Sequence, residues 1–125
     1  SLATLEERLD DLVKQDVYKP DCLIVDGYDF GSSDLTSLQS FAEFMDKRGL
    51  NAIWFSAVSH RGDKRVSDSG IPAPCHEMDD MFSTVLFINP EAEAIKLDII
   101  KCTACEIDAS AKLAFDPSTM LISKI

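Results

Sequence analysis

Hydrophobic positions recur at helical spacing in two stretches near the start of the chain. The first stretch runs from residue 2 to about residue 16, carries charged side chains on its other face and ends before Pro20. The second follows a polar loop, 31–34, that supplies capping groups, and it ends at Gly49, a typical residue after a helix. We therefore predict two amphipathic helices. Their apolar stripes are Leu2, Leu5, Leu9, Leu12 and Val13 in the first, and Leu35, Leu38, Phe41, Ala42 and Met45 in the second.

Two short apolar runs, 22–26 and 52–56, lie on either side of the second helix and predict buried strands. A strand, a helix and a strand in this order predict a parallel pair with a right-handed connection. The first run reads as the central strand of a parallel sheet. A long polar loop, 59–74, follows, and loops of this length inside compact domains are usually functional or disordered.

The remainder of the chain is rich in strand signals separated by short turns. We predict a short helix over 76–81, strands over 83–88 and 94–101 with a turn at Asn89-Pro90-Glu91, and a closing hairpin formed by 112–115 and 120–125. The pattern predicts one α/β domain, residues 1–125, in which a parallel βαβ unit precedes mixed and antiparallel strands.

Composition narrows the class of protein. The chain has 125 residues and a net charge of −10, which argues against a general nucleic-acid surface. No apolar run approaches the ~20 residues of a membrane span, so we expect no membrane contact. Four cysteines in a domain of this size favour reduced thiols in a cytoplasmic protein. The first residue is Ser rather than Met, from which we expect an excised or processed piece.

The best candidate for chemistry is Asp26, because it follows a predicted parallel strand. Ligands of open α/β sheets bind at the carboxyl edge, where an acid can hold Mg²⁺, position a water or accept a phosphoryl group. Asp29 is either a second acid or a turn residue. Ser56 and His60 follow the next predicted strand and should lie beside Asp26 if the two strands are neighbours. His60 is then either a sensor or acid/base group, or a surface side chain.

A basic cluster and a pair of cysteines could each have either a functional role or a purely structural one. Arg61, Lys64 and Arg65 form a basic cluster in the long loop, which either contacts nucleic acid or is simply solvated; the net charge favours the solvated loop. Cys102 and Cys105 have half of a zinc-ligand spacing. A redox C-x-x-C normally opens a helix, whereas this one follows a predicted strand, so we expect plain reduced thiols.

Taken in order, these segments resemble the second half of a RecA-like ATPase core, in the group that contains RadA, KaiC and the DnaB-type helicases. The run ending in Asp26 resembles the Walker B strand, and Ile53 to His60 resembles the next strand with its polar sensor. His60-Arg61-Gly62 is similar to the start of the loop found there in RadA-like proteins. The segments 76–86, 95–101 and 113–116 resemble, in turn, the helix entering the following strand, the strand that ends in a Lys, and the terminal hairpin.

The resemblance implies a RecA-like three-layer sandwich and a role in ATP hydrolysis. It implies that Asp26 and His60 are catalytic, that Asp26 holds Mg²⁺, and that Ser56 and Lys101 contact ATP, Lys101 across a subunit boundary. It places a possible nucleic-acid loop at Arg61, Lys64 and Arg65. The intact protein would then couple ATP to remodelling of nucleic acid or protein.

Two departures from the family pattern limit this expectation. The 125 residues contain no G-x-x-x-x-G-K-[ST] phosphate loop, and the catalytic Glu that the family carries between that loop and the Walker B strand is missing as well. The Arg expected near Lys101 is Thr103. We therefore expect an incomplete P-loop NTPase core that does not hydrolyse ATP alone. Mg²⁺ and ATP would be cofactors of the intact protein, with none bound to this chain.

Two other functions fit part of the pattern. The chain is alternatively a non-catalytic interaction module that kept the fold. A receiver-like phosphoacceptor domain fits less well, since too few residues precede Asp26 and consecutive strands replace alternating helices. Because a sheet without its first strand has an open edge, we also expect self-association into a homodimer or higher oligomer.

Overall fold

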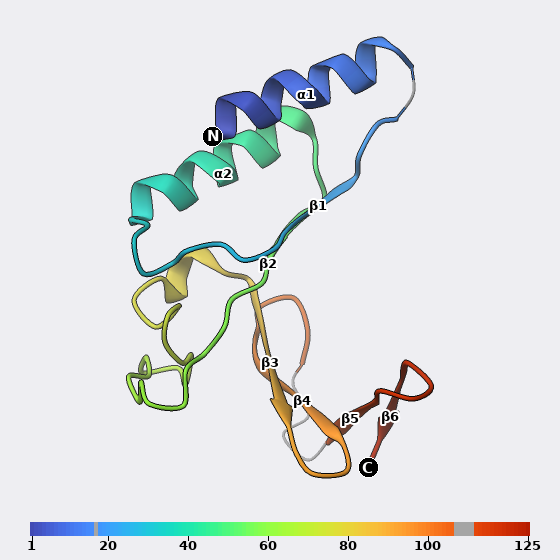
Figure 1. Ribbon diagram of the computed structural model, residues 1–125. Coiled ribbons are helices and arrows are strands. Elements are labelled where there is room, and N and C mark those ends of the chain that lie inside the picture. Colours follow the sequence, from blue (N-terminus) through green and yellow to red (C-terminus); the bar gives the residue numbers. More distant parts are fainter. Residues whose placement is uncertain (17, 107–111) are drawn as a thin grey trace. The chain divides into compact units, whose positions relative to one another are not determined.

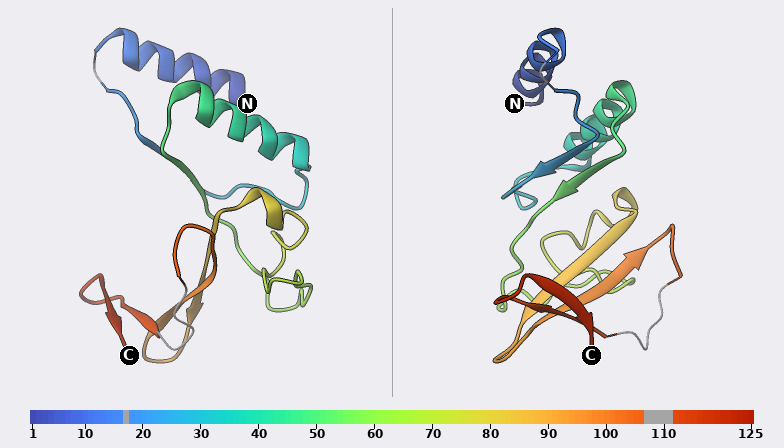
Figure 2. Two further views of the ribbon diagram at one scale, coloured as in Figure 1. Left: turned by 180° about the vertical axis from the view of Figure 1, so that it is seen from behind. Right: turned by 90° about the vertical axis from the view of Figure 1, so that its right-hand side faces the viewer.

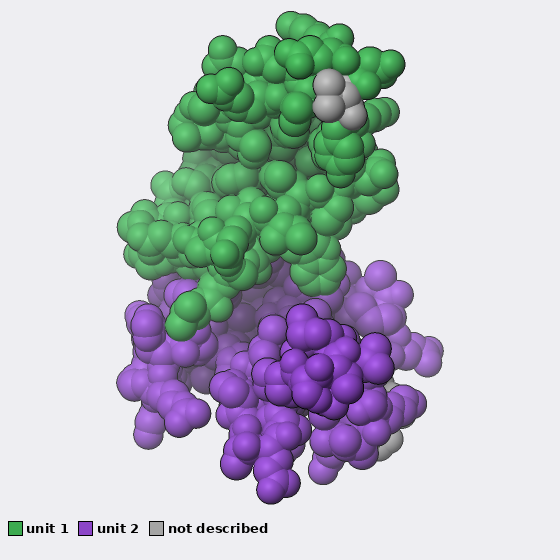
Figure 3. All heavy atoms as spheres, turned by 45° about the vertical axis from the view of Figure 1, so that its right-hand side comes forward, with its two compact units in different colours: residues 1–58 green, residues 59–125 purple. Residues whose placement is uncertain are grey.

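A computed structural model gives the structure of the chain and describes residues 1–16, 18–106 and 112–125 (Figure 1). The chain divides into two compact units, residues 1–58 and residues 59–125, which Figure 3 shows in separate colours. Unit 1 contains a parallel sheet of two strands, and unit 2 contains an antiparallel sheet of four strands. The predicted mixture of helices, parallel strands and antiparallel strands is confirmed. The single domain over 1–125 stays a prediction.

Unit 1 has the predicted order of helix, strand, helix, strand. The Ser1 hydroxyl caps the first helix by accepting the Thr4 N–H, and the Asp34 carboxylate caps the second by accepting the Ser37 N–H at 2.9 Å. Gly49 ends the second helix in the left-handed region, with φ of 66°, as its position predicted. The elements are α1 (Leu2–Lys14), β1 (Cys22–Val25), α2 (Leu35–Arg48) and β2 (Ala52–Phe55). Of the described helices, none is long and apolar enough to cross a membrane.

The core of unit 1 lies between its helices and one face of its sheet. β1 and β2 pair in parallel, and α1 and α2 cover one face of the pair (Figure 2). Leu9 from α1 packs with Phe44 and Leu50, and Leu23 and Ile53 from the strands pack against this cluster. The period-2 alternation of a strand explains the arrangement, because every second side chain of β1 and β2 faces the helices.

The opposite face of this sheet is uncovered. Ile24 is 74% exposed and its register partner Trp54 is 44% exposed. The sequence predicted that this run is the central strand of a parallel sheet. Among the described residues β1 pairs with β2 alone, so it is not a central strand there. The apolar run is continuous because both of its faces carry apolar side chains, yet only one of these faces contacts the helices. Because each strand of this pair has a single partner in the part of the chain that the structure describes, each also has an open edge there.

Unit 2 is built on a meander of consecutive antiparallel strands, as predicted. After the 3₁₀ helix η1 (Asp79–Met81) come β3 (Thr84–Pro90), β4 (Ile95–Cys102), β5 (Leu113–Asp116) and β6 (Leu121–Lys124), hydrogen-bonded in that order. The turn between β3 and β4 lies later than predicted, because Pro90 still pairs with Ile95 and the Glu91 N–H donates to the Ala94 carbonyl at 2.9 Å. Pro90 is tolerated there because β3 is an edge strand.

The long loop before η1 is compact. Val66 forms an isolated β-bridge with Pro72, and Ser67 and Ile71 exchange main-chain and side-chain hydrogen bonds of 2.9 and 3.0 Å. Ile71 is fully buried. The helix predicted over 76–81 is shorter than expected, because successive i→i+3 bonds lead into the three residues of η1. A buried apolar side chain thus fixes a loop whose sequence is mostly polar.

The cysteines differ from expectation. Cys102 and Cys105 form a disulfide, whereas Cys22 and Cys75 are free. The expectation of reduced thiols is therefore wrong at the C-x-x-C pair. β4 ends at Cys102, and the turn that follows brings the two Cα atoms to 5.6 Å, a separation that a disulfide spans.

Candidate functional site

Asp26 and Ser56 meet at the carboxyl ends of β1 and β2. The Ser56 N–H donates to the Val25 carbonyl at 3.0 Å, which continues the parallel ladder by one step. The Ser56 hydroxyl donates to Asp26 Oδ1. The Gly27 N–H in turn donates to Ser56 Oγ at 3.1 Å. The sequence predicted that these two side chains would be neighbours, and the structure confirms it.

The local backbone explains this arrangement. Gly27 has φ of 68°, a left-handed conformation that glycine adopts without strain, and it turns the chain immediately after Asp26. This turn directs the Gly27 N–H toward β2, so Ser56 accepts one hydrogen bond while it donates another. Ser56 therefore fixes one oxygen of the Asp26 carboxylate. Both side chains belong to exposed residues, so solvent reaches the pair.

Asp29 is an anchor of its own loop. Its carboxylate accepts the Gly31 N–H at 3.1 Å and the Ser32 N–H at 3.2 Å, together with the Ser32 hydroxyl. These hydrogen bonds, that of the Ser32 hydroxyl first, lower the pKa of Asp29 below its ordinary value. The turn interpretation of Asp29 is the one that the structure supports.

The predicted loop residues lie in unit 2, and two of them, His60 and Arg65, have partners within the loop. The His60 carbonyl accepts the Asp63 N–H at 3.0 Å, and the His60 side chain is exposed. Arg65 forms a fork onto Asp63, with Nε to Oδ1 at 2.9 Å and Nη2 to Oδ2 at 2.6 Å, and it holds the pKa of that carboxyl far below its ordinary value. Arg61 and Lys64 are exposed. One charge of the basic cluster is thus neutralised within the loop.

Lys101 ties β4 to η1. Its Nζ donates to the Asp79 carbonyl at 2.8 Å and to Asp79 Oδ1 at 3.1 Å. The hydroxyl of Ser69 donates to the other oxygen of the same carboxylate, and Ser67 and Ser69 lie 3.0 Å apart at their hydroxyls. The Ser69 hydroxyl and then Lys101 lower the pKa of Asp79. In the described structure Lys101 therefore holds the loop onto the sheet.

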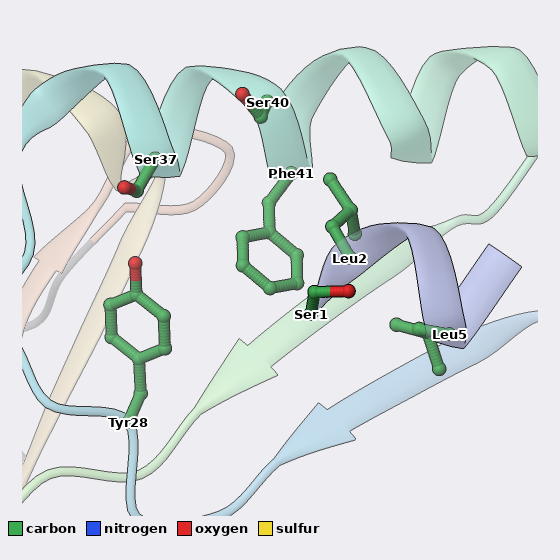
Figure 4. Close-up of a pocket in the computed structure, with 7 residues that line it drawn as sticks. All are labelled: Ser1, Leu2, Leu5, Tyr28, Ser37, Ser40 and Phe41. Carbon is green, nitrogen blue, oxygen red and sulfur yellow. The ribbon is translucent and has the colours of Figure 1, made fainter.

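A groove of about 520 Å³ lies beside the two helices of unit 1 (Figure 4). Its lining is mostly apolar, with hydroxyl groups among the apolar side chains. Ser37 donates to Asp34 and Ser40 donates to the Thr36 carbonyl, each at 3.0 Å, so the helix itself uses these two hydroxyls. The lining residues are Ser1, Leu2, Leu5, Tyr28, Ser37, Ser40 and Phe41. The groove offers shape and apolar surface but few polar groups that could select a ligand.

The Asp26–Ser56 pair fits part of a magnesium site. Carboxylate and hydroxyl oxygens are hard donors, and Mg²⁺ is usually held by one or two carboxylates together with waters and substrate phosphates. Within residues 1–16, 18–106 and 112–125, no three His, Cys, Asp or Glu side chains are grouped so as to hold a metal ion. Among the described residues the pair therefore supplies one carboxylate and one hydroxyl oxygen and does not form a closed metal site.

Comparisons with known proteins give no relative. A scan against protein-family models, a search of curated proteins and a search of solved structures found no match to this chain.

Sequence reasoning missed two features of unit 2. The contact of Asp79 with Ser69 and Lys101 joins residues that are 10 and 22 positions apart, and no regular spacing marks it. The Cys102–Cys105 disulfide does have a sequence signal, the C-x-x-C spacing, but a pair that follows a strand is not typical of a redox motif.

Proposed function

We propose that this chain is the Walker B-containing part of a RecA-like ATPase core, and that its phosphate-binding part is supplied from outside these residues. The observation that supports this proposal is the Asp26–Ser56 hydrogen bond at the carboxyl ends of a parallel strand pair joined by a helix. Nucleotide-binding α/β proteins hold their ligand at this edge of the sheet, and Asp26 lies at this edge. The finer assignment to a three-layer RecA-like sandwich is part of this proposal.

In the proposed site each side chain has a separate task. Asp26 would hold Mg²⁺, which supplies charge stabilisation for the transferring phosphoryl group. Ser56 orients the carboxylate by its hydrogen bond, and the Gly27 N–H orients Ser56. His60 as a sensor or acid/base group and Lys101 as a contact to ATP belong to the proposal as well. Arg61 and Lys64 are the side chains available for a nucleic-acid contact, which the net charge of −10 disfavours.

The first test uses this chain and Mn²⁺ as a paramagnetic substitute for Mg²⁺. The isolated chain should contact the ion only weakly and transiently, so we expect the amide NMR signals of Gly27 and Ser56 to broaden as Mn²⁺ is titrated, and Asp26→Asn to abolish the effect, because the Asp26 carboxylate is the main ligand. Asp21→Asn is the matched control, since Asp21 is an exposed acid next to the other end of the same strand. Equal broadening in wild type and Asp26→Asn would exclude Asp26 as a metal ligand.

The second test concerns the parent gene. A G-x-x-x-x-G-K-[ST] sequence upstream of Leu2, with an acid after it, would support the ATPase. In that longer protein Asp26→Asn should lower ATP hydrolysis by about 10²- to 10³-fold, the usual effect of removing one preorganised electrostatic group. A start codon near Leu2 would overturn the proposal.

For the isolated chain we predict negligible binding of Mg-ATP. The β- and γ-phosphates need a nest of backbone N–H groups and a Lys, and the sequence has no such loop. Isothermal calorimetry with Mg-ATP checks this expectation. A micromolar dissociation constant would show that another segment replaces the phosphate loop.

The alternative function is a non-catalytic interaction module. It is favoured by the missing phosphate loop and by the uncovered apolar face at Ile24 and Trp54. The upstream sequence separates the two functions, since an interaction module needs no GK[ST] loop.

A further inference from the structure

The disulfide between Cys102 and Cys105 closes a turn of four residues at the end of β4. Cys102 is the last residue of the strand and is half-buried, whereas Cys105 is exposed, as are Thr103 and Ala104 between them. The bond therefore lies at the surface of unit 2, with one sulfur in the sheet and the other in an exposed turn.

This disulfide does not hold separate parts of the chain together. Cys102 is already paired with Thr84 in the ladder, and the Thr103 N–H donates to the Ser83 carbonyl at 2.9 Å. A disulfide stabilises a fold mainly by restricting the unfolded chain, and the restriction is smallest for the shortest loops. The bond thus adds little to what the β3–β4 hydrogen bonds provide, and exposed disulfides with little structural role are the labile ones.

We propose that Cys102 and Cys105 form a thiol–disulfide exchange site, which a low-molecular-weight monothiol of the glutathione class opens at Cys105. Neither the Mg²⁺ site nor ATP enters this inference, so it does not depend on the proposed function. Cys105 is the exposed residue of the pair and Cys102 is half-buried, so Cys105 is the side that an external thiolate reaches more readily.

The exchange takes two balanced steps. The thiolate of the first monothiol attacks Cys105 Sγ, the bond to Cys102 breaks, and its electron pair leaves on Cys102 Sγ, which takes a proton from water. The thiolate of a second monothiol then attacks the monothiol sulfur of the mixed disulfide and releases Cys105 as a thiolate. Two monothiols are oxidised to one disulfide while the protein disulfide is reduced to two thiols.

The other cysteines provide internal controls. Cys75 is also in unit 2, but it is half-buried, and burial raises the pKa of its thiol, which makes it less reactive. Cys22 is exposed but has no disulfide to exchange. A reagent that labels thiols should therefore label Cys22 readily and Cys75 slowly, whatever the redox state of the C-x-x-C pair.

The test is an equilibration of the folded chain with glutathione buffers of graded ratio, followed by acid quenching, alkylation and mass spectrometry. We expect Cys102 and Cys105 to become labelled together as reduced glutathione reaches millimolar concentration, while the label at Cys22 stays constant. The amide of Thr103 should then exchange with solvent faster, and that of Leu97, in the middle of β4, should not. A disulfide that stays intact at millimolar glutathione would overturn the proposal.

Two variants compare how readily each sulfur takes part in exchange. In each variant the remaining thiolate attacks oxidised glutathione and releases one glutathione thiolate. Cys102→Ser leaves the exposed Cys105, and Cys105→Ser leaves the half-buried Cys102. With oxidised glutathione we expect the mixed disulfide to form about tenfold faster in Cys102→Ser, because exchange rates follow the access to the sulfur. Equal rates in the two variants would overturn the assignment of Cys105. Unchanged circular dichroism in both variants verifies that the sheet is retained.

Discussion

Asp10 and Arg48 join the two helices of unit 1 through a forked ion pair. Arg48 Nη1 donates to Asp10 Oδ1, and Nη2 donates to Oδ2 at 3.2 Å, while Glu6 lies 3.8 Å from the same guanidinium. The hydrogen bonds from Arg48 lower the pKa of Asp10 and raise that of Arg48. Since the pair links α1 to α2, its state of ionisation bears on how firmly the helices are held.

This pair predicts a pH dependence that one variant should remove. The pKa of Asp10 in the folded chain lies below its ordinary value of 3.8, so the carboxylate stabilises the fold fully above that pH. The contribution is lost as the pH falls through the lowered pKa. We expect wild type to lose more unfolding free energy than Asp10→Asn between neutral pH and about pH 2, measured by urea titrations.

Asp11→Asn is the matched control, because it removes one carboxylate at the next position of α1 and leaves the Asp10–Arg48 pair intact. It should follow the wild-type pH profile. If Asp10→Asn and Asp11→Asn lost the same free energy on acidification, the ion pair would carry no pH linkage.

For single side chains, the sequence predicted those contacts that follow from the placement of strands. Asp26 and Ser56 each follow a strand of one parallel pair, so their contact could be expected although 30 positions separate them. The contact between Asp79 and Lys101 depends on how a loop folds over a sheet, and neither spacing nor periodicity encodes that. The disulfide depends on a turn geometry that the C-x-x-C spacing permits but does not require.

The helices and strands of unit 1 are held by a small core in which Phe44 is central. Phe44 is 3% exposed and packs with Leu9 and Leu50. We predict that Phe44→Ala lowers the free energy of unfolding of unit 1 by about 3–5 kcal/mol, through lost burial and the cavity that remains. Chemical denaturation followed by far-ultraviolet circular dichroism measures this change.

Leu35→Ala is the control for the loss of an apolar side chain from the same helix. Leu35 is 47% exposed, so its removal should change the unfolding free energy by less than about 1 kcal/mol. Similar losses in Phe44→Ala and Leu35→Ala would mean that the α2 face identified as buried is not the one that stabilises unit 1.

Most helices and strands followed from periodicity and turn residues, and the exceptions have physical causes. Asn89 and Pro90 predicted the start of a turn, yet an edge strand accepts a proline, and the turn begins two residues later, after Pro90. The segment 76–81 is too short for a stable α-helix, whose first turn is costly to nucleate, and it forms i→i+3 turns instead. The number of strands beside β1 could not be predicted, because apolar alternation does not show which face or edge is covered.

As a whole molecule the chain combines a net charge of −10 with an open, apolar sheet face. The open edges of β1 and β2 favour pairing with a second copy, while the charge opposes it. We therefore predict self-association that increases with salt, because salt screens the repulsion. Multi-angle light scattering over a range of protein and salt concentrations measures the mass.

Ile24→Lys should weaken this association, because it places a charge on the uncovered face, where Ile24 is 74% exposed. Val13→Lys is the control, since Val13 is exposed on α1, away from the strands. A monomeric mass at high protein and high salt concentration would refute self-association.

The two sheets also differ in the sequence separation between the strands that pair. This difference predicts an order of folding. Pro90 pairs with Ile95 across a short turn. Cys22 pairs with Ala52, and the whole of α2 lies between these two residues in the sequence. Loop closure costs more entropy for longer loops, and a hairpin forms within about 1–10 μs. In refolding from denaturant, we expect pulsed hydrogen exchange to find β3 and β4 protected first; protection of β1 and β2 at the same time would contradict this order. Within these 125 residues, folding would then begin in unit 2, which follows unit 1 in the sequence.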